Sequence, residues 1–307
     1  MNFQQYNGLV VPTITPFTSD EKIDEKSLRN LISFLISEGV HGLWIAGTSG
    51  EFSAMQDSER LKSLEIAIDE TKKRVPIIFN ISATSTNLAI YLAEKVKLLE
   101  IQGIALTPPY YFNSPQNELL EHYRKINAVC PNIPLWIYNI PQTVKTVVSV
   151  ETVIQLAKEG VVQGIKDSSG DGEYFSEIVT SCHLNNIKLN KFLGTHHRIG
   201  TASNVDADGI IPGTGNAIPK IIVNAWDSSI SNDVSSLNSA IKKISVFSGF
   251  TKFAVGKGRT QANLGIIKAT LEIKGIIKNS SLSAPLESLT DQEKIHLEKA
   301  LKENDLI

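Results

Sequence analysis

Two reactive side chains stand at the ends of apolar runs in this sequence. Lys166 ends the run VVQGIK and is followed at once by the polar loop DSSGDG, and Tyr138 lies near the end of LWIYNI. A lysine with a buried stem has a lowered pKa, because desolvation disfavours the ammonium form. The neutral amine can attack a carbonyl and form an imine, which an arginine cannot do. A tyrosine hydroxyl beside it would carry protons during that reaction.

Each of these signals also has a purely structural explanation. A lysine at a strand end can extend its charged tip into solvent, and a tyrosine there can belong to the core with its hydroxyl at the surface. The turn GTSGE at 47–51 offers two hydroxyls and several backbone N–H groups, which suit a carboxylate or a phosphate. Glycine turns between a strand and a helix are common, however, so this turn alone identifies no ligand.

The histidines and cysteines do not predict a metal site. His196 and His197 are adjacent, which is a poor arrangement for binding one ion, and no cluster of Asp, Glu or Cys accompanies them. The two cysteines, Cys130 and Cys182, have no metal-like spacing. Their small number indicates a reducing compartment and no disulfide framework.

The composition is that of an ordinary globular protein. The chain has 307 residues, of which 42% are hydrophobic and 20% charged, and a net charge of −2. Scattered Lys and Arg give no footprint for nucleic acid, and no run approaches the roughly 18 apolar residues that a membrane span needs. The N-terminus has no signal-peptide pattern. We therefore expect a cytoplasmic protein that acts on small molecules.

Short β-branched runs recur along the chain and alternate with helical patterns. Apolar residues at helical spacing occupy 28–36, 61–68 and 88–99, and Thr86 is the expected N-cap of the third helix. Alternating strands and helices predict parallel βαβ units. The eight runs lie at 9–15, 42–47, 75–82, 103–109, 135–140, 161–166, 189–194 and 208–213.

Eight such units match a (β/α)8 barrel, whose usual length is about 250 residues. An open, doubly wound sheet is the alternative, but no glycine fingerprint follows the first run. Residues 225–307 break the alternation, and Thr290 with Glu293 forms a capping box for a last helix. We predict a catalytic barrel over 1–224 and a C-terminal helical extension over 225–307. In such a barrel the active site lies at the carboxyl ends of the strands.

The motifs GTSGE, TPPYY, YNIP and GIKDSSG, in this order, resemble the dihydrodipicolinate synthase/N-acetylneuraminate lyase family of pyruvate-dependent class I aldolases. The similarity runs from VVPTITPF to ADGIIPGTGN and is weaker after residue 225. It implies a lyase built on a barrel with a C-terminal helical extension, usually a homotetramer of tight dimers. It also implies pyruvate and an aldehyde as substrates and no cofactor or metal, because the covalent imine supplies the electron sink.

The resemblance implies a role for each matching residue. Lys166 matches the lysine that forms the imine, and Tyr138 matches the tyrosine that relays protons to it. Thr48 and Ser49 match the hydroxyl pair that holds the pyruvate carboxylate. Tyr111 matches the tyrosine that is lent across the dimer interface and completes the relay with Thr48. The substrate-binding positions expected on this basis are Gly47, Thr48, Ser49, Thr143, Gly194, His196 and Ile211.

Two departures from the synthases bear on the substrate. The synthases carry an arginine five residues after the tyrosine of YNxP, where it helps to bind the carboxylate of the semialdehyde. This chain has Thr143 there, with Lys145 as the nearest cation. His196 and His197 replace acidic residues that usually follow the seventh strand, which could favour an acidic or phosphorylated substrate. YNIPQ followed by GIKDSS is more similar to the 2-keto-3-deoxygluconate aldolase branch.

Three hypotheses follow from these observations. The first is an aldolase that cleaves or condenses a 2-keto-3-deoxy sugar acid. The second is a dihydrodipicolinate synthase, which condenses pyruvate with aspartate semialdehyde. The third is a barrel that binds a keto acid without turnover, which the presence of Lys166, Tyr138 and Thr48 disfavours.

Overall fold

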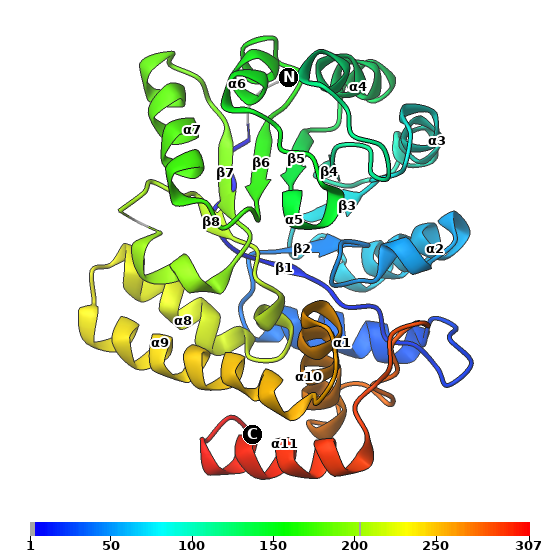
Figure 1. The fold of residues 1–307 in the computed structure, drawn as a ribbon, viewed down its shortest axis with the longest axis vertical. Coiled ribbons are helices and arrows are strands. Elements are labelled where there is room, and N and C mark those ends of the chain that lie inside the picture. The colour runs from blue at the N-terminus through cyan, green and yellow to red at the C-terminus, as the bar shows by residue number, and fades with distance from the viewer. Residues whose placement is uncertain (1–3, 203) are drawn as a thin grey trace. The chain divides into compact units, whose positions relative to one another are not determined.

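The fold is a closed barrel of eight parallel strands that alternate with helices, as the sequence predicts (Figure 1). The computed structural model describes residues 4–202 and 204–307. The strands neighbour one another in chain order and are shorter than the apolar runs that predict them. They are β1 (Gly8–Pro12), β2 (Gly42–Ile45), β3 (Ile77–Asn80), β4 (Gly103–Leu106), β5 (Leu135–Asn139), β6 (Gly164–Asp167), β7 (Asn190–Leu193) and β8 (Gly209–Ile210).

The chain divides into two compact units. The first unit combines the described residues up to Gly8 with Ile77–Ile211, and the second combines Leu9–Pro76 with Pro212–Ile307. In the first unit, the helices α3, α4, α6 and α7 flank the strands from β3 onward (Figure 1). Its helices are α3 (Thr86–Val96), α4 (Gln116–Val129), α5 (Pro141–Val144), α6 (Val150–Lys158) and α7 (Gly172–Leu184), and a 3-10 helix covers His196–Thr201.

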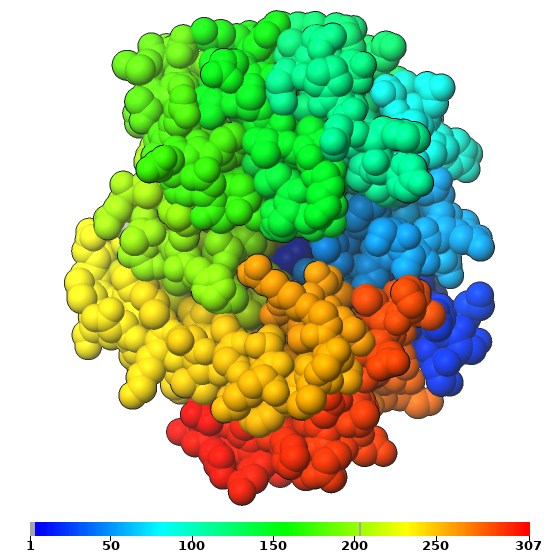
Figure 2. All heavy atoms as spheres, viewed as in Figure 1, coloured from blue at the N-terminus to red at the C-terminus, as the bar shows by residue number. Residues whose placement is uncertain are grey.

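The second unit contains β1, β2 and the helices of the C-terminal segment, which is helical as predicted. In Figure 2, α8 and α9 (yellow) lie side by side and α11 (red) lies beside α10 (orange), in agreement with their contacts. The predicted boundary at residue 224 stays a prediction, and α8 runs across it. The helices are α1 (Glu25–Ser37), α2 (Asp57–Thr71), α8 (Pro219–Ile230), α9 (Val234–Gly249), α10 (Arg259–Ile273) and α11 (Asp291–Glu303).

Helix starts follow local capping rules, with one correction. Thr290 accepts from the N–H of Glu293, so the predicted capping box of α11 is confirmed. The predicted N-cap of α3 is wrong by one residue: Ser85 caps this helix by accepting from the Leu88 N–H. Thr86 is the first helical residue, and its hydroxyl lies 2.9 Å from Nδ1 of the His122 ring. Two adjacent hydroxyl residues are both good caps, so sequence alone does not separate them.

A repeated hydrogen bond marks the amino ends of the strands. Each even-numbered strand begins with glycine, and the polar residue before it accepts from a backbone N–H near the start of the preceding strand. This contact satisfies a backbone donor at the barrel's amino end. The acceptor side chains are His41, Gln102, Gln163 and Asp208, and the donors are Leu9, Ile77, Leu135 and Lys191.

Candidate active site

Lys166 and Tyr138 lie opposite each other on neighbouring strands. The register of β5 and β6 pairs Tyr138 with Lys166 directly, and both side chains are buried, at 2% and 3% exposure. The Lys166 Nζ lies 4.1 Å from the centroid of the Tyr138 ring. Because paired residues on adjacent strands project to the same face, the amine and the phenol belong to one site.

Burial lowers the pKa of Lys166 from its ordinary value of 10.5, and the nearby Tyr138 opposes this only in part. Desolvation disfavours the ammonium form, so the fraction of neutral amine at neutral pH is larger than for an exposed lysine. A neutral amine is the nucleophilic form. The lowered pKa of Lys166 therefore favours the neutral amine that imine formation requires.

A second cross-strand pair, one residue further along, fixes the register beside this site. Asn139 pairs with Asp167, and its amide donates to the buried Asp167 carboxylate over 2.9 Å. The same carboxylate accepts from the N–H and the hydroxyl of Ser169, at 3.1 and 2.9 Å. Sequence reasoning missed these residues. The signal was available, because Asn139 and Asp167 directly follow Tyr138 and Lys166 in the chain.

Gly194 is explained by a close approach to the loop that follows β6. Its N–H donates to the Asp167 carbonyl over 2.6 Å, and a Cβ at this position would lie 1.9 Å from the Ser168 Oγ. No larger residue fits there without displacing the loop. Ile211 is buried, and its N–H donates to the Leu193 carbonyl over 2.7 Å. Both predicted positions thus lie at the carboxyl ends of β7 and β8.

His196, the first of the paired histidines after β7, differs in charge from the sequence interpretation. The ring centroids of the two histidines are 4.1 Å apart. Burial, with a smaller contribution from His197, lowers the pKa of His196 to about 4. At neutral pH, His196 is therefore a neutral imidazole that offers one donor and one acceptor. This state suits hydroxyl groups better than it suits a carboxylate or a phosphate.

Thr143 and Lys145 lie in the short helix α5 after β5. Thr143 is exposed, and its N–H donates to the Ile140 carbonyl over 3.0 Å. The ammonium of Lys145 donates to the Gln142 carbonyl over 3.1 Å, so this cation is engaged by its own turn. Tyr111, in the loop after β4, is 87% exposed and has a φ of 89°, with its ring edge against Phe112.

The turn GTSGE lies in the second unit, directly after β2. Thr48 and Ser49 are half-buried, and the Gly50 N–H donates to the Gly47 carbonyl over 3.0 Å. A Cβ at Gly47 would lie 2.8 Å from the Trp44 ring, which explains the glycine. The two hydroxyls lie in one small polar turn, and the anion-binding role expected for it stays a prediction.

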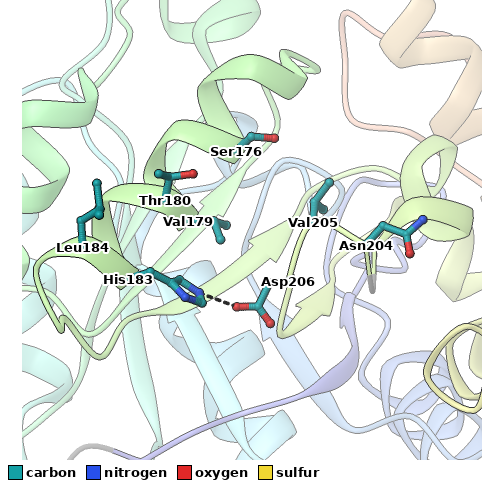
Figure 3. A pocket seen from close by; sticks show the side chains of 8 residues that line it. All are labelled: Ser176, Val179, Thr180, His183, Leu184, Asn204, Val205 and Asp206. Atoms are coloured by element: carbon teal, nitrogen blue, oxygen red, sulfur yellow. Dashed lines mark hydrogen bonds and ion pairs between the residues drawn. The ribbon is translucent and has the colours of Figure 1, made fainter.

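A further hollow lies on the first unit, away from these residues. It has a volume of about 380 Å³ between α7 and residues 204–206 (Figure 3). At one edge the Nε2 atom of His183 lies 2.8 Å from a carboxylate oxygen of Asp206. None of the predicted site residues lines this hollow.

Two other kinds of site are absent from the described part of the chain. Within residues 4–202 and 204–307, no group of three or more His, Cys, Asp and Glu side chains is arranged to hold a metal ion. Over the same residues, no helix is both long enough and apolar enough to cross a membrane.

The low pKa of Lys166 predicts a stability cost. We expect Lys166→Met to raise the melting temperature, by about 2 to 4 °C for each kcal/mol gained, because methionine needs no hydration. Lys166 is protonated below about pH 10 in the unfolded chain, whereas burial lowers its pKa in the folded protein. The loss of folding stability that Lys166 causes therefore grows as pH falls below about 10. Melting curves at pH 7 and pH 10 should therefore show a larger gain at pH 7.

The matched control is Lys191→Met. Lys191 is a similarly buried lysine, but its ammonium lies 2.8 Å from the Asp208 carboxylate. Removing it leaves the half-buried Asp208 carboxylate without its cation, which destabilises the fold. A fall in melting temperature for Lys166→Met as well as for Lys191→Met would contradict the desolvation argument.

Comparison with known proteins identifies the family to which this chain belongs. The sequence model described as the dihydrodipicolinate synthetase family matches residues 5–304. A 4-hydroxy-tetrahydrodipicolinate synthase from Thermodesulfovibrio yellowstonii is 34% identical over 225 residues, which cover 72% of this chain and 76% of that protein.

Solved structures agree with the observed fold. Dihydrodipicolinate synthase from Bacteroides thetaiotaomicron has a TM-score of 0.90 and 27% identity, covering 99% of this chain and 100% of that chain. YagE from E. coli K12, solved in complex with pyruvate, also has a TM-score of 0.90. It is 22% identical and covers 98% of this chain and 99% of its own. At that identity, the second likeness is evidence for the fold alone.

Proposed function

This chain belongs to the dihydrodipicolinate synthetase family of carbon–carbon lyases, and from that premise we propose that it reversibly cleaves a 2-keto-3-deoxy sugar acid of the 2-keto-3-deoxygluconate type. Pyruvate-dependent aldol chemistry is common to the family. The particular substrate, the residue roles and the assembly are our inference from the site. The observation that supports the reaction most directly is the buried pair of Lys166 and Tyr138, with Nζ 4.1 Å from the ring centroid.

In the proposed reaction, the neutral amine of Lys166 attacks the C2 keto carbon of the substrate. Tyr138 donates a proton to the oxygen, which leaves as water when the iminium ion forms. A base then removes the proton of the C4 hydroxyl, the C3–C4 bond breaks, and its electron pair enters the iminium to give an enamine. The aldehyde departs, C3 takes up a proton, and hydrolysis releases pyruvate. Condensation is the same sequence in reverse.

Other residues have supporting roles in this proposal. Thr48 and Ser49 bind the carboxylate of pyruvate through their hydroxyls and the N–H groups of their turn, which includes Gly47. Tyr111 is lent to the site of a second copy and completes the proton relay there. Its ring is 87% exposed, which leaves it available for such a contact. The active assembly is accordingly a homodimer or a homotetramer, and the imine needs no metal.

The choice of a sugar acid rests on the residues beyond the pyruvate site. Thr143 offers a hydroxyl where a synthase would need an arginine, and Lys145 is held by the Gln142 carbonyl. His196 is neutral at pH 7 because its pKa is about 4. Hydroxyl and neutral imidazole groups both donate and accept hydrogen bonds, so they suit a polyol chain.

A dihydrodipicolinate synthase is the second candidate. It is favoured by the named relative from Thermodesulfovibrio yellowstonii, which is 34% identical to this chain. A charge-assisted hydrogen bond to a carboxylate contributes about 1.5–3 kcal/mol, and each 1.4 kcal/mol is about tenfold in rate. The two candidates therefore differ measurably in their use of aspartate semialdehyde.

Side-by-side kinetics with pyruvate and either aldehyde test the proposal. We expect kcat/KM for glyceraldehyde to exceed that for aspartate semialdehyde by roughly ten- to hundredfold. Thr143→Arg should raise kcat/KM for the semialdehyde by about tenfold, because it restores the cation that binds the second carboxylate. A preference of the unaltered enzyme for aspartate semialdehyde would identify it as a synthase instead.

A further inference from the structure

A buried ion pair adjoins the GTSGE turn in the second unit. The Oε1 atom of Glu51 lies 2.5 Å from the Nζ of Lys268, and the two side chains are 2% and 0% exposed. Glu51 is the last residue of the turn, and Lys268 belongs to α10, far along the chain. Burying two charges is costly, and replacing such a pair with apolar side chains is often neutral for stability. Stability alone is therefore a weak explanation for this pair.

Both partners also form hydrogen bonds with the segment that follows α10. The Oε2 atom of Glu51 accepts from the N–H and the hydroxyl of Ser283, at 2.8 and 2.6 Å. The ammonium of Lys268 donates to the Ser281 carbonyl over 2.8 Å and lies 4.3 Å from the centroid of the Phe17 ring. The carboxylate is thus held by three groups that come from α10 and from the segment that follows it.

These contacts constrain the backbone of the turn. Glu51 has a φ of 59°, a left-handed conformation that a side chain with a Cβ adopts only when its surroundings enforce it. On the other side, the hydroxyl of Thr15 donates to the Gly50 carbonyl over 2.8 Å. The turn is therefore fixed immediately after Thr48 and Ser49, by Thr15 through Gly50 and by the C-terminal segment through Glu51.

We propose that Glu51 and Lys268 are positioning residues, which hold the Thr48–Ser49 turn in the geometry that binds the carboxylate of a keto acid. The inference rests on the proposed function, in which Thr48 and Ser49 make that contact. It gives α10 of the C-terminal segment a role in substrate binding, because Lys268 of this helix supplies the cation that holds Glu51 and hence the turn. Neither residue touches the substrate, so their effect should be on pyruvate binding rather than on the reaction of the bound imine.

The test measures the pyruvate concentration that gives half-maximal borohydride trapping, together with the melting temperature, in Glu51→Gln and in Glu51→Gln/Lys268→Met. We expect both variants to need about 10- to 100-fold more pyruvate, because small displacements of binding groups have effects of this size. The KM for the aldehyde should stay within about twofold, and the rate at saturating pyruvate should fall less than the affinity, because Thr48 also belongs to the expected proton relay. The double variant should regain most of the stability that Glu51→Gln loses, but not the affinity for pyruvate.

The matched control is Lys257→Met/Glu293→Gln, which removes another poorly exposed ion pair of the same unit. Its atoms are 3.2 Å apart, and it joins the loop before α10 to the first turn of α11. This control should lower the melting temperature and leave pyruvate trapping unchanged. An equal loss of pyruvate affinity in the control and in the Glu51 variants would overturn the proposal.

Two further results keep the inference separate from the proposed function. Absence of trapping in the unaltered protein would refute the imine mechanism itself. Normal trapping there, with unchanged half-saturation in both Glu51 variants, would refute only the positioning role. If Glu51→Gln does not fold, Ser283→Ala removes one hydrogen bond to the same carboxylate, and a rise of about threefold in half-saturating pyruvate is expected. No rise in that variant would overturn the proposal.

Discussion

Borohydride added together with pyruvate is expected to inactivate this protein irreversibly and to add a reduced pyruvyl group to the peptide that contains Lys166. Burial lowers the pKa of this lysine, so an attacking amine is available near neutral pH. Hydride reduces the iminium carbon and converts a reversible bond into a stable secondary amine. Peptide mass spectrometry after digestion reports the site, and residual activity reports its consequence.

Two other buried lysines serve as internal controls for this labelling. Lys191 and Lys268 lie 2.8 and 2.5 Å from the carboxylates of Asp208 and Glu51. Each amine also donates to a backbone carbonyl, that of Leu189 or of Ser281, so both are engaged in structural contacts and neither should react. Lys166→Arg keeps a cation but cannot form an imine, and loss of a covalent nucleophile should lower kcat by about 10⁴-fold or more. Labelling at Lys191 or Lys268, or turnover by the arginine variant, would contradict the mechanism.

The fold and the reactive pair could be predicted because their signals are local. Short β-branched runs alternating with amphipathic helices define the barrel. The run that ends in Lys166 and the run that ends after Tyr138 belong to consecutive strands, and consecutive strands of such a barrel are neighbours. The structure adds the register, in which Tyr138 pairs directly with Lys166. The family match confirms the resemblance that these motifs carry.

Strand ends and single helical faces were predicted less well. The expected run 208–213 yields only Gly209–Ile210, because the residues after it turn into a 3-10 helix. Leu88 was expected on the buried stripe of α3 but is 49% exposed, and small alanines, Ala89 and Ala93, face the core instead. A helical periodicity that counts only large apolar side chains misses alanines, which also belong to the face that packs against the core.

The ion pair of Glu51 and Lys268 illustrates a limit of reading a sequence locally. Glutamate in GTSGE reads as a helix-start residue, and Lys268 reads as one cation within an apolar helix. Their contact depends on how α10 packs in the folded unit, which no local pattern encodes. The glycine that opens each even-numbered strand, by contrast, was visible. The pairs HG, QG, QG and DG stand at the starts of β2, β4, β6 and β8, although a DG pair also stands at the start of α7.

Tyr138→Phe is expected to lower kcat by about 10²- to 10⁴-fold, the usual effect of losing a general acid–base group. The aromatic ring that faces the Lys166 Nζ is retained, so the lysine keeps this contact and only the hydroxyl is lost. Imine formation needs a proton for the departing oxygen, and its rate should fall with kcat. Pyruvate binding at equilibrium should weaken much less, because the hydroxyl acts on the reaction path rather than on the carboxylate.

A buried tyrosine outside the reactive pair is the matched control for this variant. The Tyr123 hydroxyl donates to the Leu106 carbonyl over 3.2 Å, at the end of β4. Tyr123→Phe should cost about 1 kcal/mol of stability and leave kcat within about twofold. Stopped-flow measurement of imine formation, combined with borohydride trapping at long times, separates a slow reaction from weak binding. If Tyr138→Phe reacts as fast as Tyr123→Phe, the Tyr138 ring has only a packing role and another group moves the proton.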